Sequence, residues 1–168
     1  MGFRPYVLTA VLAAAAVGLR IGLPYALLAL SFVPAAAILE TRRDLETVAS
    51  ELSKDGIKSQ APAMIVGKSG IKHEFALAVV GGDGKPKVVV DTELSIKDVD
   101  EMKVLKFYVK VFDVSPGKAV LCVSPRLNER GRSLAKEYQI LVAEDEVPKN
   151  LVTAAESLLR KIASGAEK

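Results

Sequence analysis

An apolar segment near the N-terminus limits what this chain can form more than any other feature. Between Pro5 and Leu39 the only charged residue is Arg20, although 26% of the whole sequence is charged. A helix of about 20 residues crosses a bilayer core, so the segment is too long for one perpendicular span. It divides at Gly18-Leu-Arg-Ile-Gly-Leu-Pro24, whose glycines, proline and single charge indicate a turn. We therefore expect residues 1–40 to form a transmembrane helical hairpin with arms at 5–17 and 25–39.

The positive charges that flank the apolar segment predict its orientation. Arg4 precedes the first arm, and Arg42 and Arg43 follow the second. Lysine and arginine flanks favour the cytoplasmic side, so we expect a protein that crosses the cell membrane twice, with its soluble domain in the cytoplasm and the lipid bilayer as a partner. Two alternatives are a single long or re-entrant span, and a cleaved signal peptide over residues 1–16.

The rest of the chain is close to neutral. Of 23 Lys and Arg residues only Arg4 and Arg20 precede residue 40, whereas all 20 Asp and Glu residues follow residue 39. Net charge therefore predicts no nucleic-acid-binding surface, although a sum cannot exclude a local basic patch. The single cysteine, Cys122, excludes a disulfide framework and a cysteine zinc site, and its apolar surroundings predict a core position.

Hydrophobic periodicity after residue 40 predicts one cytoplasmic α/β domain over residues 41–168, in which helices flank a mixed sheet. Gly81-Gly-Asp-Gly84 should close a β-hairpin, and Ser95-Ile-Lys-Asp98 has the form of a helix-capping box. The helix that follows should bury the stripe Val99, Met102, Leu105, Val109 and Phe112. We expect helices at 41–53, from 95 to about 114, 128–138 and 147–163, and strands at 63–66, 75–80, 87–90, 119–123 and 140–143.

Acidic residues gather at the ends of two predicted strands. Asp91 and Glu93 stand two apart on one strand and should share a face, while His73 and Glu74 begin the paired strand. Carboxylates so placed could hold a hard cation such as Mg²⁺, and His73 could act as a base or ligand. The simpler interpretation is that a strand leaves the core here and becomes solvated, with His73 as a hydrogen-bonding group at a strand end.

Several segments resemble the restriction-endonuclease-like superfamily, whose PD-(D/E)xK signature has an acid on one strand and an acid-x-Lys on the next. They are Ser69-Gly-Ile-Lys-His-Glu-Phe75, Val88-Val-Val-Asp91, Leu105-Lys-Phe-Tyr-Val-Lys-Val-Phe-Asp113 and Ser133-Leu-Ala-Lys-Glu-Tyr-Gln-Ile-Leu-Val142. They are similar to an archaeal branch of the superfamily. The resemblance implies a nuclease fold, a catalytic set of Glu74, Asp91, Glu93 and Lys110, and Mg²⁺ held by Glu74 and Asp91.

The signature is nevertheless degenerate. Ala76 stands where an acid is expected, and Glu93 replaces the lysine that would polarise the phosphate. Lys110 is a displaced substitute for that lysine or, alternatively, a solvated helix residue. Three hypotheses follow: a membrane-tethered nuclease fold that has lost catalysis and binds protein or nucleic acid, an active metal-dependent nuclease, or a small subunit of a membrane complex. In the third, Ala13–Ala16 and Ala35–Ala37 would allow close helix packing, with another protein or a second copy.

Overall fold

A computed structural model describes residues 23–163 of the chain, and it divides the protein into two units, residues 1–39 and 40–168. Helix α2 (Leu23–Lys54) is continuous over 32 residues. The predicted second arm at 25–39 and the predicted helix at 41–53 are therefore one helix. The reason is local, because residues 35–54 contain neither glycine nor proline and are rich in good helix formers.

The predicted transmembrane hairpin is wrong as a description of this fold. Within residues 23–163, no helix combines the length and the apolar composition that a membrane crossing requires. The second arm is the first part of a helix that continues into the α/β unit, and the first arm, 5–17, lies outside the described residues. The localisation inferred from the hairpin stays a prediction that nothing in the structure tests.

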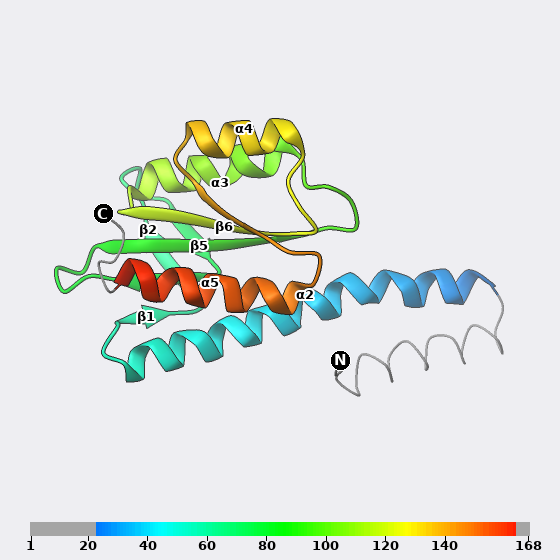
Figure 1. Ribbon diagram of the computed structural model, residues 1–168, viewed down its shortest axis with the longest axis horizontal. Coiled ribbons are helices and arrows are strands. Elements are labelled where there is room, and N and C mark those ends of the chain that lie inside the picture. The colour runs from blue at the N-terminus through cyan, green and yellow to red at the C-terminus, as the bar shows by residue number, and fades with distance from the viewer. Residues whose placement is uncertain (1–22, 164–168) are drawn as a thin grey trace. The chain divides into compact units, whose positions relative to one another are not determined.

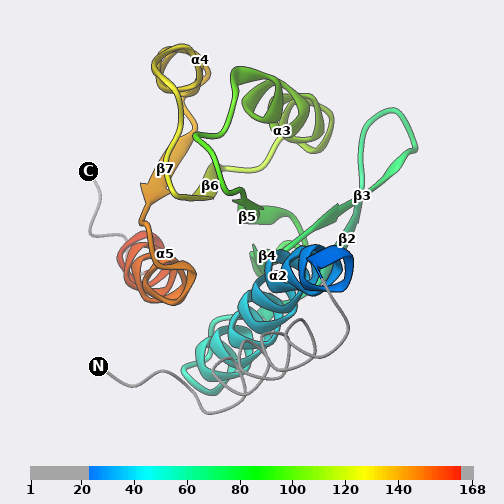
Figure 2. The ribbon, with the colours of Figure 1, turned by 90° about the vertical axis from the view of Figure 1, so that its right-hand side faces the viewer.

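The second unit is built on a five-stranded mixed sheet, which confirms the predicted α/β class (Figure 1). Strand order is β1-β4-β5-β6-β7; the pairs β1·β4 and β4·β5 are antiparallel, and β5, β6 and β7 run parallel. The bounds are β1 Ser59–Gln60, β4 Leu77–Val80, β5 Pro86–Leu94, β6 Lys118–Ser124 and β7 Leu141–Glu144. Strands β2 (Ala63–Val66) and β3 (Lys72–Phe75) form a separate hairpin that projects beside α3 (Figure 2).

Helices cover both faces of the sheet. Helices α3 (Glu101–Val114) and α4 (Glu129–Glu137) lie on one face, and α5 (Pro148–Ala163) lies on the other with the end of α2 (Figure 2). Side chains of β5 alternate between the layers: Val88 and Val90 pack towards α2 and α5, whereas Val89 packs towards α3 and α4. Strand β6 is buried on both faces, and Cys122 lies in the core, as predicted.

The structure corrects two further expectations. The predicted strand at 75–80 is split at Ala76 into β3 and β4. Helix α3 begins after Asp100, whose side chain accepts the amide of Lys103, so the Ser95 segment is not its cap. The buried residues of α3 are Val104 and Phe107, while Met102, Val109 and Phe112 of the predicted stripe are exposed. Apolar residues occur almost all round this helix, so periodicity did not identify the buried face.

The position of Leu52 yields a test of where the core begins. Leu52 is fully buried in the cluster that joins α2, α5 and the sheet. We expect Leu52→Ala to lower the free energy of unfolding by about 2–5 kcal/mol because it leaves a cavity. Ser50→Ala, an exposed change on the same helix, should shift it by less than about 0.5 kcal/mol. Urea unfolding of the full-length chain measures both, and equal midpoints would show that α2 is not part of the core.

Candidate functional site

The candidate site begins where β5 leaves the core. Asp91 follows the buried Val90 and, by alternation, points to the face of the sheet that α3 covers. Lys110 of α3 donates a hydrogen bond to Asp91 Oδ2 and a second, of 2.7 Å, to the backbone carbonyl of Glu74. The side chains of Asp91 and Lys110 are 25% and 27% exposed, so most of the pair is removed from water.

Burial and the lysine act on Asp91 in opposite directions. Burial raises the pKa of Asp91 and is the larger effect, while the charge and hydrogen bond of Lys110 lower it. The Lys110 ammonium also lies 4.9 Å from the centre of the Phe75 ring. It is thus surrounded by a carboxylate oxygen, a carbonyl oxygen and an aromatic face. A carboxylate and a carbonyl are the oxygen ligands that hard divalent cations take, and here the Lys110 ammonium binds both.

Glu93 has a different cation. It points to the same face as Asp91, and its Oε2 accepts a 2.7 Å hydrogen bond from Lys103 Nζ. That hydrogen bond is the main reason the pKa of Lys103 is raised. Lys103 and Lys110 lie about two turns apart on α3 and therefore on one side of it. Two acids of one strand are thus matched by two lysines of the helix above them.

The Glu74 carboxylate lies apart from this set. In the β2–β3 hairpin Glu74 pairs with Met64, and both side chains are exposed, while His73 points inward. The Glu74 side chain forms an ion pair with Arg42 of α2, and only its backbone carbonyl reaches Lys110. Across residues 23–163, no three His, Cys, Asp or Glu side chains are arranged to hold a metal ion.

His73 belongs to a second cluster, which we call the Asp113 clasp: Ser69, His73 and Asp113. The Asp113 carboxylate accepts hydrogen bonds from Ser69 N (2.8 Å), Ser69 Oγ (2.6 Å) and His73 Nε2 (2.7 Å). These bonds, with the Ser69 hydroxyl contributing most, lower the pKa of Asp113 to about 2. Serine and histidine both donate to the carboxylate, so the histidine is not arranged to activate the serine as a nucleophile. The clasp fastens the β2–β3 turn to the end of α3.

Gly67 is required at this turn by close packing. A Cβ built on Gly67 would lie 1.9 Å from Asp113 Oδ2, so any larger residue would displace the carboxylate. The clasp therefore accounts for Gly67 in the predicted turn 67–70. It also gives His73 the hydrogen-bonding role that the simpler interpretation of the sequence proposed.

Sequence reasoning missed four of the residues involved: Arg42, Ser69, Lys103 and Asp113. A signal existed for Lys103, because lysines two turns apart on the helix after Asp91 and Glu93 could have been matched with those acids. No spacing pointed to Asp113 or Ser69, which are 44 residues apart. Their contact depends on how the hairpin folds back onto α3.

An open depression of about 540 Å³ lies at the carboxyl ends of the parallel strands, where α3 and α4 begin. It is lined by charged groups of both signs. Arg126 donates to Asp98 at 3.1 and 3.2 Å, and Arg130 lies 3.6 Å from Glu101. Because each of these arginines faces an acid, the depression has no excess of one charge.

Comparisons with known proteins describe the fold only. No protein-family model matches the chain, and no curated protein matches it. A crystal structure of a protein of unknown function, AF1548, superimposes with a TM-score of 0.51 at 11% identity, over 70% of this chain and 67% of that one. Protein VC1899 from Vibrio cholerae gives a TM-score of 0.49 at 15% identity, over 69% of this chain and 32% of its own length. The first likeness supports a shared fold and says nothing of activity.

We expect a double-mutant cycle to measure a favourable interaction free energy between Asp91 and Lys110. Lys110→Met leaves a mostly buried carboxylate without its cation, which we expect to cost about 1–3 kcal/mol of unfolding free energy at neutral pH. Asp91→Asn combined with Lys110→Met should cost less than the sum of the single changes. Lys106→Met, at an exposed position of α3, is the matched control. Strictly additive losses would mean that the two side chains do not interact.

The Asp113 clasp predicts an acid-labile contribution to stability. The pKa of Asp113 is about 2 in the folded protein, below its ordinary value of 3.8, so the clasp stabilises the fold above pH 4 and is lost as the pH falls from about 4 to about 2. In Asp113→Asn this contribution is absent, and stability should fall less steeply across that interval. Urea midpoints measured against pH for both proteins test this; parallel curves would contradict it.

Proposed function

We propose that residues 40–168 form a macromolecule-binding module, built on a restriction-endonuclease-like scaffold, that does not cleave phosphodiesters. One observation carries the proposal: the Lys110 ammonium lies between the Asp91 carboxylate and the Glu74 carbonyl. Metal-assisted hydrolysis needs such oxygens to hold the ion that binds the phosphate and activates water. Here a side chain of the protein itself already neutralises them.

The remaining acids support the same proposal. Glu93 stands in place of the signature lysine and is engaged by Lys103, and the Glu74 carboxylate is engaged by Arg42. Each acid of the predicted set therefore has its own basic partner, from two different helices. These separate ion pairs hold α2 and α3 against the strands. The three carboxylates do not converge on one position where they could bind an ion together. The partner that fits such a module is a protein or a nucleic acid.

The second candidate is an active metal-dependent nuclease, and one contact favours it. Lys110 does reach Asp91 from α3, as the displaced lysine of the signature would. In this alternative Asp91 and the Glu74 carbonyl would hold Mg²⁺ after Lys110 moves aside, and Lys110 would then stabilise charge on the phosphate.

A plasmid-nicking assay separates the two candidates. We expect the full-length chain, with Mg²⁺ or Mn²⁺, to nick supercoiled plasmid no faster than the metal-containing buffer does. Asp91→Ala and Lys110→Ala should leave this background unchanged. Lys136→Ala, an exposed change on α4, is the control for preparation-dependent contaminants. Metal-dependent nicking that Asp91→Ala and Lys110→Ala both abolish, while Lys136→Ala retains it, would refute the proposal and establish the nuclease.

A further inference from the structure

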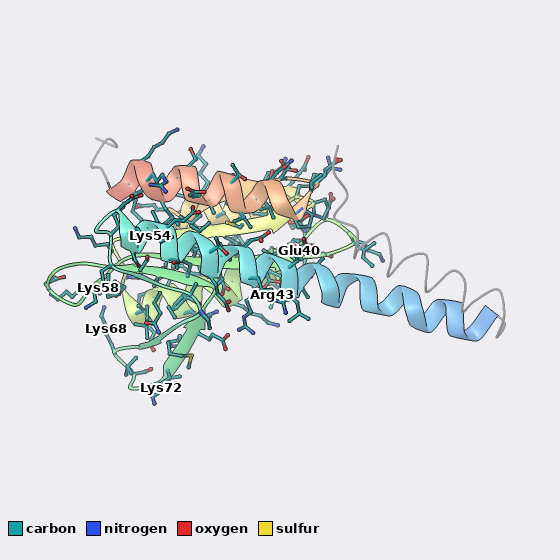
Figure 3. The ribbon with its side chains drawn as sticks, turned by 90° about the horizontal axis from the view of Figure 1, so that it is seen from below. Glu40, Arg43, Lys54, Lys58, Lys68 and Lys72 are labelled. Atoms are coloured by element: carbon teal, nitrogen blue, oxygen red, sulfur yellow. The ribbon has the colours of Figure 1, made fainter. Side chains whose placement is uncertain are left out.

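Six lysines gather at the end of the second unit where β5 begins, a surface that we call the lysine end. Its members come from the end of α2, the loop after it, the β2–β3 hairpin and the β4–β5 turn. Figure 3 labels four of them: Lys54 and Lys58 lie at the end of α2 away from Glu40 and Arg43, and Lys68 and Lys72 lie on the β2–β3 hairpin. The six residues are Lys54, Lys58, Lys68, Lys72, Lys85 and Lys87.

Backbone contacts bring these loops to one end of the sheet. The amide of Val80, the last residue of β4, donates to the carbonyl of Lys58 at 2.8 Å. The amide of Gly81, next along the chain, donates to the carbonyl of Lys85 at 2.8 Å. Lys58, Lys85 and Lys87 are therefore held around the β4–β5 turn, where β5 starts.

The hairpin lysine joins the same end through α3. Lys68 Nζ donates to Ser115 Oγ at 2.5 Å, and Gly117, two residues further on, donates its amide to the carbonyl of Pro86 at 3.2 Å. The chain after α3 thus connects the β2–β3 turn to the first residue of β5. Lys72 begins β3, next to this turn.

The lysine end carries an excess of positive charge, although it includes one acid of the β4–β5 turn, Asp83, whose Oδ1 accepts a hydrogen bond from the Lys85 amide at 3.1 Å. All six side chains are exposed, and five of them form no ion pair with any described residue; Lys68 bonds only to a neutral hydroxyl. Two nearby acids are engaged elsewhere, since Asp55 pairs with Arg160 at 2.5 Å and Asp113 belongs to the clasp. By contrast, Lys103 and Lys110 are both paired with acids. A nearly neutral unit therefore carries a basic surface that its net charge conceals.

The form of this surface indicates the partner. Lysines are strongly hydrated point charges suited to phosphates, and these stand on separate loops instead of converging on one small anion. Because these lysines come from four separate segments of the chain, together they can meet successive phosphates of an extended polyanion.

We propose that the lysine end binds nucleic acid through its phosphate backbone, without sequence preference. This inference rests on the proposed binding function and names its partner and surface. The surface is separate from the Asp91–Lys110 pair, so binding does not depend on that site. Because the attraction is electrostatic, it should weaken steeply with salt.

The test is fluorescence anisotropy of a labelled oligonucleotide of about 20 nucleotides, single-stranded and as a duplex, titrated with the full-length chain. The test variant is Lys54→Gln with Lys58→Gln and Lys87→Gln. We expect its affinity to fall roughly 10-fold or more, and the slope of log K against log salt to fall by about 2 to 3, one phosphate contact per lysine. The matched control, Lys97→Gln with Lys106→Gln and Lys136→Gln, removes the same charge from exposed positions elsewhere and should bind within about twofold of the unmodified chain.

Three results would overturn the inference: no binding to either oligonucleotide at about 50 mM salt, an equal loss in both triple variants, or binding only to vesicles of phosphatidylserine and phosphatidylcholine. Failure here is distinguishable from failure of the proposed function. Absence of binding together with absence of nicking refutes only the nucleic-acid partner. Binding together with Asp91-dependent nicking refutes the non-catalytic proposal and leaves the lysine end standing.

Discussion

The central strand β5 is buried on both faces, and much of the structure follows from that constraint. Val88 and Val90 pack against α2 and α5, and Val89 packs against α3 and α4. The alternation continues beyond the core, so Asp91 and Glu93 are turned towards α3. A carboxylate that is partly removed from water needs a cation nearby, and α3 supplies Lys110 and Lys103. The ion pairs at the candidate site are thus a consequence of where β5 lies.

Helix α3 holds the parts of the unit together. Its buried Phe107 belongs to the core cluster on the sheet and also meets Phe75 of β3 edge-on, at 6.4 Å between ring centres. Its lysines neutralise the acids of β5, and its last turn carries Asp113, which holds the β2–β3 turn. The hairpin is not a member of the five-stranded sheet, and these contacts with α3, together with the Arg42–Glu74 ion pair to α2, hold it in place. The second unit therefore has two kinds of charged region. Acids and bases are paired beside α3, whereas the lysines where β5 begins are in no ion pair with a described residue.

This division bears on function. A site whose acids each have a basic partner contributes to packing and has little free charge with which to hold an ion. A surface whose lysines lack partners has charge available for a ligand. The two surfaces would have been confused in the sequence, where lysines of both kinds are spread between residues 54 and 110. Only the contacts in the folded protein distinguish a lysine that is paired with an acid from one whose charge is available to a ligand.

Local signals allowed much of the fold to be predicted. The apolar run of β6, the helix at 128–138 and the glycine-rich β4–β5 turn all lie close to where the sequence indicated, because backbone preference and alternation act over a few neighbouring residues. The alternation of side chains along a strand also predicted that Asp91 and Glu93 point to one face of the sheet. Local patterns failed in two places: α2 is one helix where the sequence was read as two elements, 25–39 and 41–53, and α3 buries another face than its apolar stripe suggested. The partners of the site residues are likewise a property of the folded chain. Arg42 meets Glu74 across 32 residues and Asp113 meets Ser69 across 44, and no spacing rule links such positions until sheet and helices have packed.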